Sequence, residues 1–188
     1  MPTATLTRGR GGVSPSADQQ VTSLDEVAET IREAALAAAR EKLSAPQRSL
    51  DLASLLCRPD FFERFKHGLA SAVSRTLAAN DSRVQATYVY EPSVNPDIES
   101  GAELPPDATL HLLALVTQPS SALEAFIAAL DRALTDSLKE LPSPLFAERK
   151  FTFDVSLITE KDVRLGLGPA ALLAAVFTPP LKVWQRGA

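Results

Sequence analysis

The chain has 188 residues, a net charge of -4 and 45% hydrophobic residues, as expected of one globular domain and not of a disordered or membrane-spanning chain. Its acidic balance and the lack of any Lys/Arg cluster exclude a general nucleic-acid binder, which needs a basic face to displace counterions from phosphates. No run of about 18 apolar residues is present, so the sequence predicts no membrane span and no membrane partner.

The first 22 residues predict a disordered tail, because their glycines, prolines and serines cannot bury enough apolar surface to order the chain. They contain no apolar stretch of the kind that marks a secretory signal. Arg8 and Arg10, with no acid before Asp18, leave an organelle targeting segment open as the alternative.

Residues 23–57 predict a helical extension. Ser23 and Glu26 have the spacing of a capping box, in which each side chain accepts a hydrogen bond from the other residue's backbone N–H. An alanine-rich helix follows, and a hinge broken at Pro46 separates it from a short apolar helix. Cys57 lies beside leucines there and is expected to be a buried thiol. Because one cysteine cannot form an internal disulfide, a reducing compartment and a cytoplasmic location are expected.

Residues 58–188 predict an α/β domain that opens with a helix over residues 59–80. The apolar residues of this helix repeat at helical spacing and form one buried stripe: Phe62, Phe65, Leu69, Val73 and Leu77. Gly68 lies opposite this stripe and is expected to weaken the helix by up to about 1 kcal/mol relative to alanine.

Two strands follow, over residues 83–91 and 109–117. In the first, alternation places four side chains on one face: Val84, Ala86, Tyr88 and Tyr90. The second is apolar on both faces after His111, which predicts a central strand covered on both sides, with Leu113 and Leu115 buried.

A helix that starts at Ser120 or Ser121 and a strand over residues 151–158 complete a strand–helix–strand crossover. Thr159 and Asp162 then cap a helical turn, and residues 181–184 form a short extended end. We therefore expect an α/β (α+β) fold, with a small mixed sheet of three to four strands flanked by helices and preceded by the N-terminal helical extension.

The loop between the first two strands carries acids among prolines. Asp97 and Glu99 are two residues apart, a spacing at which both carboxylates can bind one Mg²⁺ ion through oxygen. A metal site needs rigidly held carboxylates, and this loop has no periodic scaffold. We expect a solvated connector and no cofactor, with Mg²⁺ at Asp97 and Glu99 as the alternative.

Three residues in or next to the predicted strands are further candidates for catalysis: Asp107, His111 and Asp154. The apolar neighbours of His111 favour a hydrogen-bonded core histidine over a general base or a metal ligand. The segment "GLGPA" at 166–170 lacks the third glycine of a dinucleotide-binding loop and predicts a helix-breaking turn.

The order of elements over residues 61–184 resembles that of small nucleotidyltransferase-fold domains: helix, strand ending in "YVYEPS", loop, apolar strand, long helix and strand with an acid. In that family the first strand leads to a Gly-Ser turn that holds a nucleotide phosphate, the second carries two metal-binding acids, and a later strand carries a third. Here Ser93 matches the serine of the turn, but a proline stands at the glycine. Thr109 and His111 stand where the two acids belong, and Asp154 matches the third. The resemblance implies this fold with a degraded active site.

These observations lead to one functional hypothesis and two alternatives. The leading hypothesis is a catalytically inactive nucleotidyltransferase-like module that acts through a protein partner or through self-association as a homo-oligomer. The first alternative is a Mg-dependent nucleotidyltransferase or nucleotide-binding protein that uses Asp97, Glu99, Asp107 and Asp154. The second is a structural or assembly subunit unrelated to nucleotides.

Overall fold

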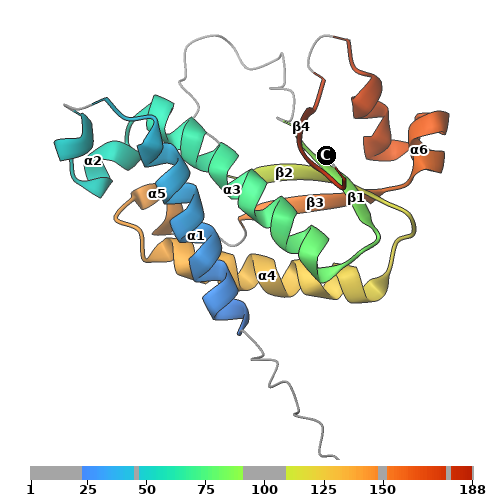
Figure 1. Ribbon diagram of the computed structural model, residues 1–188, viewed down its shortest axis with the longest axis horizontal. Coiled ribbons are helices and arrows are strands. Elements are labelled where there is room, and N and C mark those ends of the chain that lie inside the picture. Colours follow the sequence, from blue (N-terminus) through green and yellow to red (C-terminus); the bar gives the residue numbers. More distant parts are fainter. Residues whose placement is uncertain (1–22, 45–46, 91–108, 148–151, 177–178, 188) are drawn as a thin grey trace, which may run out of the picture.

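The computed structural model describes residues 23–44, 47–90, 109–147, 152–176 and 179–187 (Figure 1). The elements in chain order are α1 (Leu24–Glu41), the 3-10 helix η1 (Gln47–Ser49), α2 (Leu52–Leu56), α3 (Pro59–Asn80), β1 (Val84–Tyr90), β2 (Leu110–Val116), α4 (Ser121–Lys139), α5 (Pro144–Ala147), β3 (Phe153–Ile158), α6 (Glu160–Leu165), the 3-10 helix η2 (Gly168–Ala174) and β4 (Leu181–Gln185). The predicted disordered tail and the loop over residues 91–108 lie outside the described residues.

The strands form one mixed four-stranded sheet in the order β3-β2-β1-β4. β1 runs antiparallel to both β2 and β4, whereas β2 and β3 are parallel and are joined through α4. The predicted fold class, the crossover and the central position of β2 are confirmed. The C-terminal stretch, predicted only as extended, pairs with β1 and supplies the fourth strand (Figure 1).

One face of the sheet, here called the helical face, carries most of the hydrophobic core of the described residues. α3 and α4 lie on this side of the sheet, and α1 packs against both of these helices (Figure 1). Its largest buried side chains include Phe61, Phe62, Phe65, Leu69, Leu77, Leu110, Leu112, Leu123, Leu130 and Leu134. α1 adds Ala28, Ile31 and Leu36 to the same core. The division of the chain into residues 23–57 and 58–188 stays a prediction.

Gly68 lies in the contact between α1 and α3. A Cβ atom built at this glycine would lie 2.9 Å from Ala35 Cα and 3.0 Å from Ala35 O. Gly68 is therefore buried against a second helix, where the sequence suggested only a local weakness of α3. Because glycine has no side chain, the two backbones can pack this closely.

A β-bulge near the start of β1 changes which side chains face the helices. Pairing with β2 shifts between Val84 and Ala86. Val84 and Val89 belong to the core of the helical face, and Thr87 Oγ1 donates to Ser74 Oγ of α3 at 2.7 Å. The predicted alternation, with Val84 on the same side as Tyr88, is therefore wrong. The bulge inserts an extra residue, so the side chains after it point to the opposite face of the sheet from the one that simple alternation from Val84 predicts.

The other face of the sheet, here called the thin face, has a small cover. Ala170 of η2 packs with Leu113 of β2 and Ile158 of β3. Tyr88, Tyr90, Leu115 and Leu173 are only half-buried around this contact. The predicted burial of Leu113 is confirmed, whereas that of Leu115 is only partial, because its side chain belongs to the thinly covered side.

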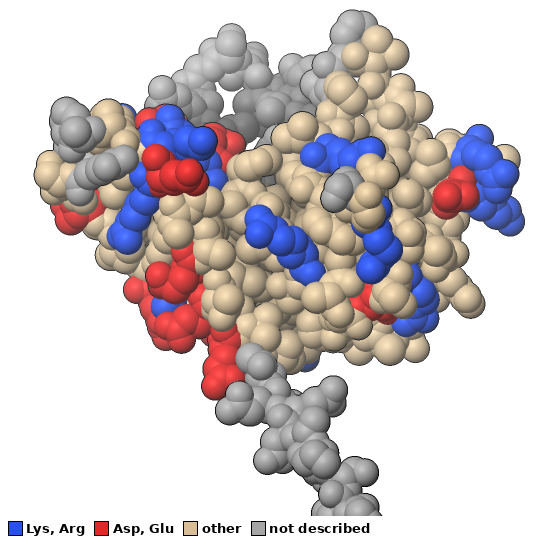
Figure 2. Space-filling view, viewed as in Figure 1, with Lys and Arg blue, Asp and Glu red and all other residues tan. Residues whose placement is uncertain are grey.

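Acidic side chains gather over the N-terminal half of α1, as Figure 2 shows. The buried Arg32 of α1 pairs with several of the surrounding acids. Its guanidinium donates to Glu140 Oε2 at 2.6 Å, to Glu29 Oε1 at 2.9 Å and to the Ser137 carbonyl at 3.0 Å. These contacts tie α1 to the C-terminal end of α4. None of the helices in the described ranges has both the length and the apolarity that a bilayer crossing needs.

Candidate functional site

Two of the predicted site residues, His111 and Asp154, lie side by side on neighbouring strands. They are partners in the parallel register of β2 and β3, and His111 Nδ1 lies 3.8 Å from Asp154 Oδ2. This distance is too long for a direct hydrogen bond but short enough for an ion pair when the imidazole is protonated. The side chain of His111 is 17% exposed and that of Asp154 is 60% exposed, so the carboxylate is the end of the pair that meets solvent.

Tyr90 of β1 lies on the opposite side of His111. The two residues are cross-strand partners, and their ring centroids are 5.5 Å apart. Burial raises the pKa of the Tyr90 phenol and the charge of Asp154 adds to the rise, while a hydrogen bond with the Ser156 side chain opposes it. Tyr90, His111 and Asp154 therefore form a row of ionisable side chains across three strands, here called the ionisable row.

The ionisable row contains the groups that proton transfer requires. An imidazole can accept or donate a proton, and a neighbouring carboxylate can orient it. The phenol with its raised pKa remains protonated at neutral pH and can donate a hydrogen bond. No group of three or more His, Cys, Asp or Glu side chains placed to hold a metal ion occurs within the described parts of the chain.

The other predicted site residues lie outside the described residues: Ser93, Asp97, Glu99 and Asp107. Their roles, and Mg²⁺ binding by Asp97 and Glu99, stay predictions. The loop that contains them joins the end of β1, which carries Tyr90, to the start of β2, which carries His111.

Cys57 differs from its prediction. The leucines beside it predict a buried thiol, but it is exposed at the C-terminal end of α2. α2 buries Leu55 and Leu56, and the helix ends before Arg58, the residue that precedes a proline. The prediction of a buried Cys57 is therefore wrong, because the burial of Leu55 and Leu56 does not extend to the side chain that follows them.

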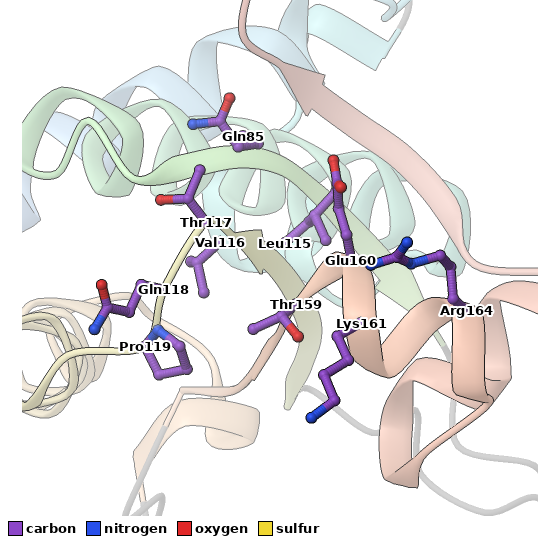
Figure 3. Close-up of a pocket in the computed structure, with 10 residues that line it drawn as sticks. All are labelled: Gln85, Leu115, Val116, Thr117, Gln118, Pro119, Thr159, Glu160, Lys161 and Arg164. Atoms are coloured by element: carbon purple, nitrogen blue, oxygen red, sulfur yellow. The ribbon is translucent and has the colours of Figure 1, made fainter.

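A cavity of about 520 Å³ at the carboxyl ends of β2 and β3 is a second feature (Figure 3). We call it the strand-end cavity. One wall follows β2 and contains Thr117, Gln118 and Pro119; the other contains Thr159 and the α6 residues Glu160, Lys161 and Arg164. No sequence motif predicts this cavity. Its signal was indirect, because the predicted crossover makes two strands parallel and brings their carboxyl ends to one edge of the sheet.

Thr159 holds α6 at the edge of this cavity. Its Oγ1 and its backbone N–H both donate to Asp162 Oδ2, at 2.6 and 2.9 Å, and complete the predicted capping box. The hydrogen bonds from Thr159 lower the pKa of Asp162, and the charge of Lys161 adds to this effect. At the other end, Gly166 adopts a left-handed φ of 62° and terminates the helix. Lys161 is therefore carried by a helical turn that is capped at both ends.

Comparison with protein-family models, with curated proteins and with solved structures finds no match to this chain. The resemblance to nucleotidyltransferase-fold domains therefore rests on the order of the elements alone.

Proposed function

We propose that this chain acts by binding protein through an apolar surface near its C-terminus, and that the bound protein is a second copy of the chain. The proposal rests on where the large apolar side chains are exposed. In the described ranges, six large apolar side chains are exposed in the segment from α6 to β4: Val163, Leu165, Leu167, Leu172, Val176 and Leu181. The one other exposed large apolar side chain in these ranges, Leu50, lies outside this segment. We call these six residues the C-terminal apolar surface.

This surface also lacks charge. No charged residue occurs over residues 165–181, and the surface over η2 is largely uncharged in Figure 2. Leu165 is 59% exposed and Val176 is 85% exposed. Apolar side chains together with depletion of charge are typical of the buried centre of a protein interface.

A second copy of the chain is the simplest partner for this surface. Most oligomers contain identical chains, and the commonest arrangement is a two-fold dimer in which the same patch contacts itself. An uncharged apolar surface suits such a contact, because it meets no like charge when it faces its own copy. A different protein as partner would have to supply a complementary surface of its own.

Sedimentation velocity of the full chain from low to high micromolar concentration tests the proposal. We expect the unaltered chain to form dimers, and Leu165→Glu with Val176→Glu to remain monomeric, because the contact would have to bury two unpaired charges from each copy. Leu50→Glu places a charge at an exposed apolar site outside the surface and should leave the dimer intact. A chain that stays monomeric throughout, or a double variant that still forms dimers, contradicts the proposal.

The second part of the proposal is that the module is nucleotidyltransferase-like. The order of helix, strand, strand, helix and strand supports it. A module with a degraded active site should neither bind nor turn over a nucleotide at that site. Calorimetric titration of the chain with ATP should therefore give no binding heat that requires Mg²⁺ and is lost in Asp154→Asn.

One observation favours the enzymatic alternative. Asp154, the match for the third acid of the family, lies beside His111 in the ionisable row. An active nucleotidyltransferase would combine Asp154 with acids of the preceding loop around Mg²⁺. Saturable ATP binding that requires Mg²⁺ and is lost in Asp154→Asn would establish this alternative over the inactive module.

A further inference from the structure

The strand-end cavity lies where the chain leaves two parallel strands in opposite directions. After β2 the chain enters α4, whose Leu123 and Leu130 belong to the core of the helical face. After β3 it enters α6 and η2, whose Ala170 packs on the thin face. In open α/β sheets, ligands bind outside the carboxyl ends of the strands at the point where neighbouring connections diverge to opposite faces. The cavity occupies the corresponding position in this sheet.

The size and lining of the cavity suit a small polar molecule. Its volume of about 520 Å³ falls within the range of small-molecule sites, which is about 300–1,000 Å³. Leu115 and Val116 line it with apolar surface, and Thr117 and Gln118 contribute a hydroxyl and a side-chain amide. Apolar walls with a few polar groups are the usual composition of such sites.

The charges on the cavity wall favour an anion. Lys161 and Arg164 are three residues apart on α6, so they start from neighbouring positions on the helix surface, and their charged ends point in different directions in Figure 3. Both line the cavity together with one acid, Glu160 (Figure 3). The other acid of this helix, Asp162, does not line it, because its carboxylate is bound to Thr159 in the capping box. The lining therefore carries two positive charges and one negative charge.

We propose that the strand-end cavity binds a small molecule through a phosphate or carboxylate group, with Lys161 and Arg164 as its charged contacts. Arginine can hold such a group through two parallel hydrogen bonds, and lysine contributes a point charge. Thr117 and Gln118 line the opposite wall, with their polar groups turned away from α6 in Figure 3. Thr159 positions α6 and does not itself bind the anion, because its hydroxyl hydrogen is donated to Asp162. No residue of the ionisable row lines this cavity.

Titration of the full, ¹⁵N-labelled chain with pyrophosphate, with citrate and with uncharged glucose tests this inference, followed by amide chemical shifts. We expect saturable shifts at Thr117, Gln118 and Lys161 with at least one of the two anions and none with glucose. Pyrophosphate alone would indicate a phosphate-bearing ligand, and citrate alone a carboxylate-bearing one. No saturable shift with either anion overturns the inference.

A pair of charge-matched variants tests the assigned residues. Lys161→Gln with Arg164→Gln should weaken binding at least tenfold, whereas Arg132→Gln with Lys139→Gln removes the same charge from α4 and should leave the affinity unchanged. All four side chains are exposed, so both double variants should keep the fold and its dispersed spectrum. Equal weakening in both double variants would show a non-specific charge effect and would contradict the site. Unchanged affinity in the first would exclude Lys161 and Arg164 as its contacts.

Discussion

The helical face and the thin face belong to the same four strands, but they are covered to very different depths. On the helical face, α1, α3 and α4 bury a continuous set of phenylalanines and leucines. On the thin face, the buried apolar contact consists of Leu113, Ile158 and Ala170. Leu112 and Leu113 are neighbours in β2 and are both fully buried, yet they belong to these two different clusters. Stability is therefore concentrated on one side of the sheet.

The candidate sites described above lie on or beside the thin face. Tyr90, His111 and Asp154 belong to the strands beside its small cluster, Leu115 lines the strand-end cavity, and the C-terminal apolar surface extends from α6 onward. A thinly covered sheet face leaves polar and apolar groups accessible, which a tightly packed core cannot do. The helical face thus contains most of the core that stabilises the fold, and the thin face presents the candidate sites.

The largest expected effect compares the two neighbouring leucines directly. Leu112→Ala should lower the free energy of unfolding by about 4 kcal/mol and Leu113→Ala by about 2 kcal/mol, within the range for leucine truncation in cores. The cost is smaller on the thin face because a thin cover can collapse into the space left by the side chain. Urea denaturation of the two variants measures both values. Equal losses would mean that the two faces are packed equally well.

Gly68→Ala tests how tightly the helical face is packed. The added methyl group would meet the backbone of Ala35, and such overpacking costs about 2 kcal/mol. Removing a glycine from a helix returns about 1 kcal/mol, so the expected net loss of unfolding free energy is about 1 kcal/mol. Ser71→Ala, one turn further along α3, is the control and should change it little. A stabilised Gly68→Ala protein would show that α1 can move away from α3 at no cost.

A smaller effect on stability is expected in the turn between α3 and β1, and it should depend on pH. The side chain of Arg83, and then its backbone N–H, hydrogen-bonds Asp81 and holds the pKa of this carboxyl below its usual value. A depressed folded-state pKa adds stability that is complete above the unfolded value of about 3.9 and is lost as the pH falls through the folded value. Asp81→Asn should therefore lower Tm at neutral pH, and the difference from the unaltered chain should shrink below about pH 4.

Thermal melts over this pH range test the Asp81 prediction. Asp136→Asn is a suitable control, because Asp136 forms an exposed ion pair with Lys139 on α4, and such pairs contribute little to stability. A Tm difference for Asp81→Asn that persists unchanged in acid would contradict the charge as its cause.

The smallest expected effect concerns the acids of the loop over residues 91–108. If this loop is a solvated connector, Asp97→Asn with Glu99→Gln should leave Tm nearly unchanged, both in millimolar Mg²⁺ and in chelator. Binding of the ion to the folded state alone would raise Tm. A gain of several degrees from Mg²⁺ in the unaltered chain, absent in the double variant, would replace the connector with a metal site.

Local sequence signals were sufficient for most of the secondary structure. The capping boxes at Ser23 and Thr159, the proline at the start of α3 and the period of its apolar stripe all act within a few residues. The crossover from β2 through α4 to β3 could also be predicted, because a long amphipathic helix between two apolar strands can pack on them in only a few arrangements. His111 and Asp154 were named as candidates from residue type and position in the strands.

The features that the sequence did not reveal depend on contacts between distant parts of the chain. The bulge in β1 arises from its pairing with β2, and it decides which of Val84 and Tyr88 faces the helices. The packing of Gly68 against Ala35 depends on how α1 crosses α3. The 3.8 Å approach of His111 to Asp154 follows from the register of β2 and β3, and the strand-end cavity forms because the chain leaves these strands toward opposite faces. Local sequence patterns do not predict such pairings, because strand register and helix crossing are determined by packing across the whole fold.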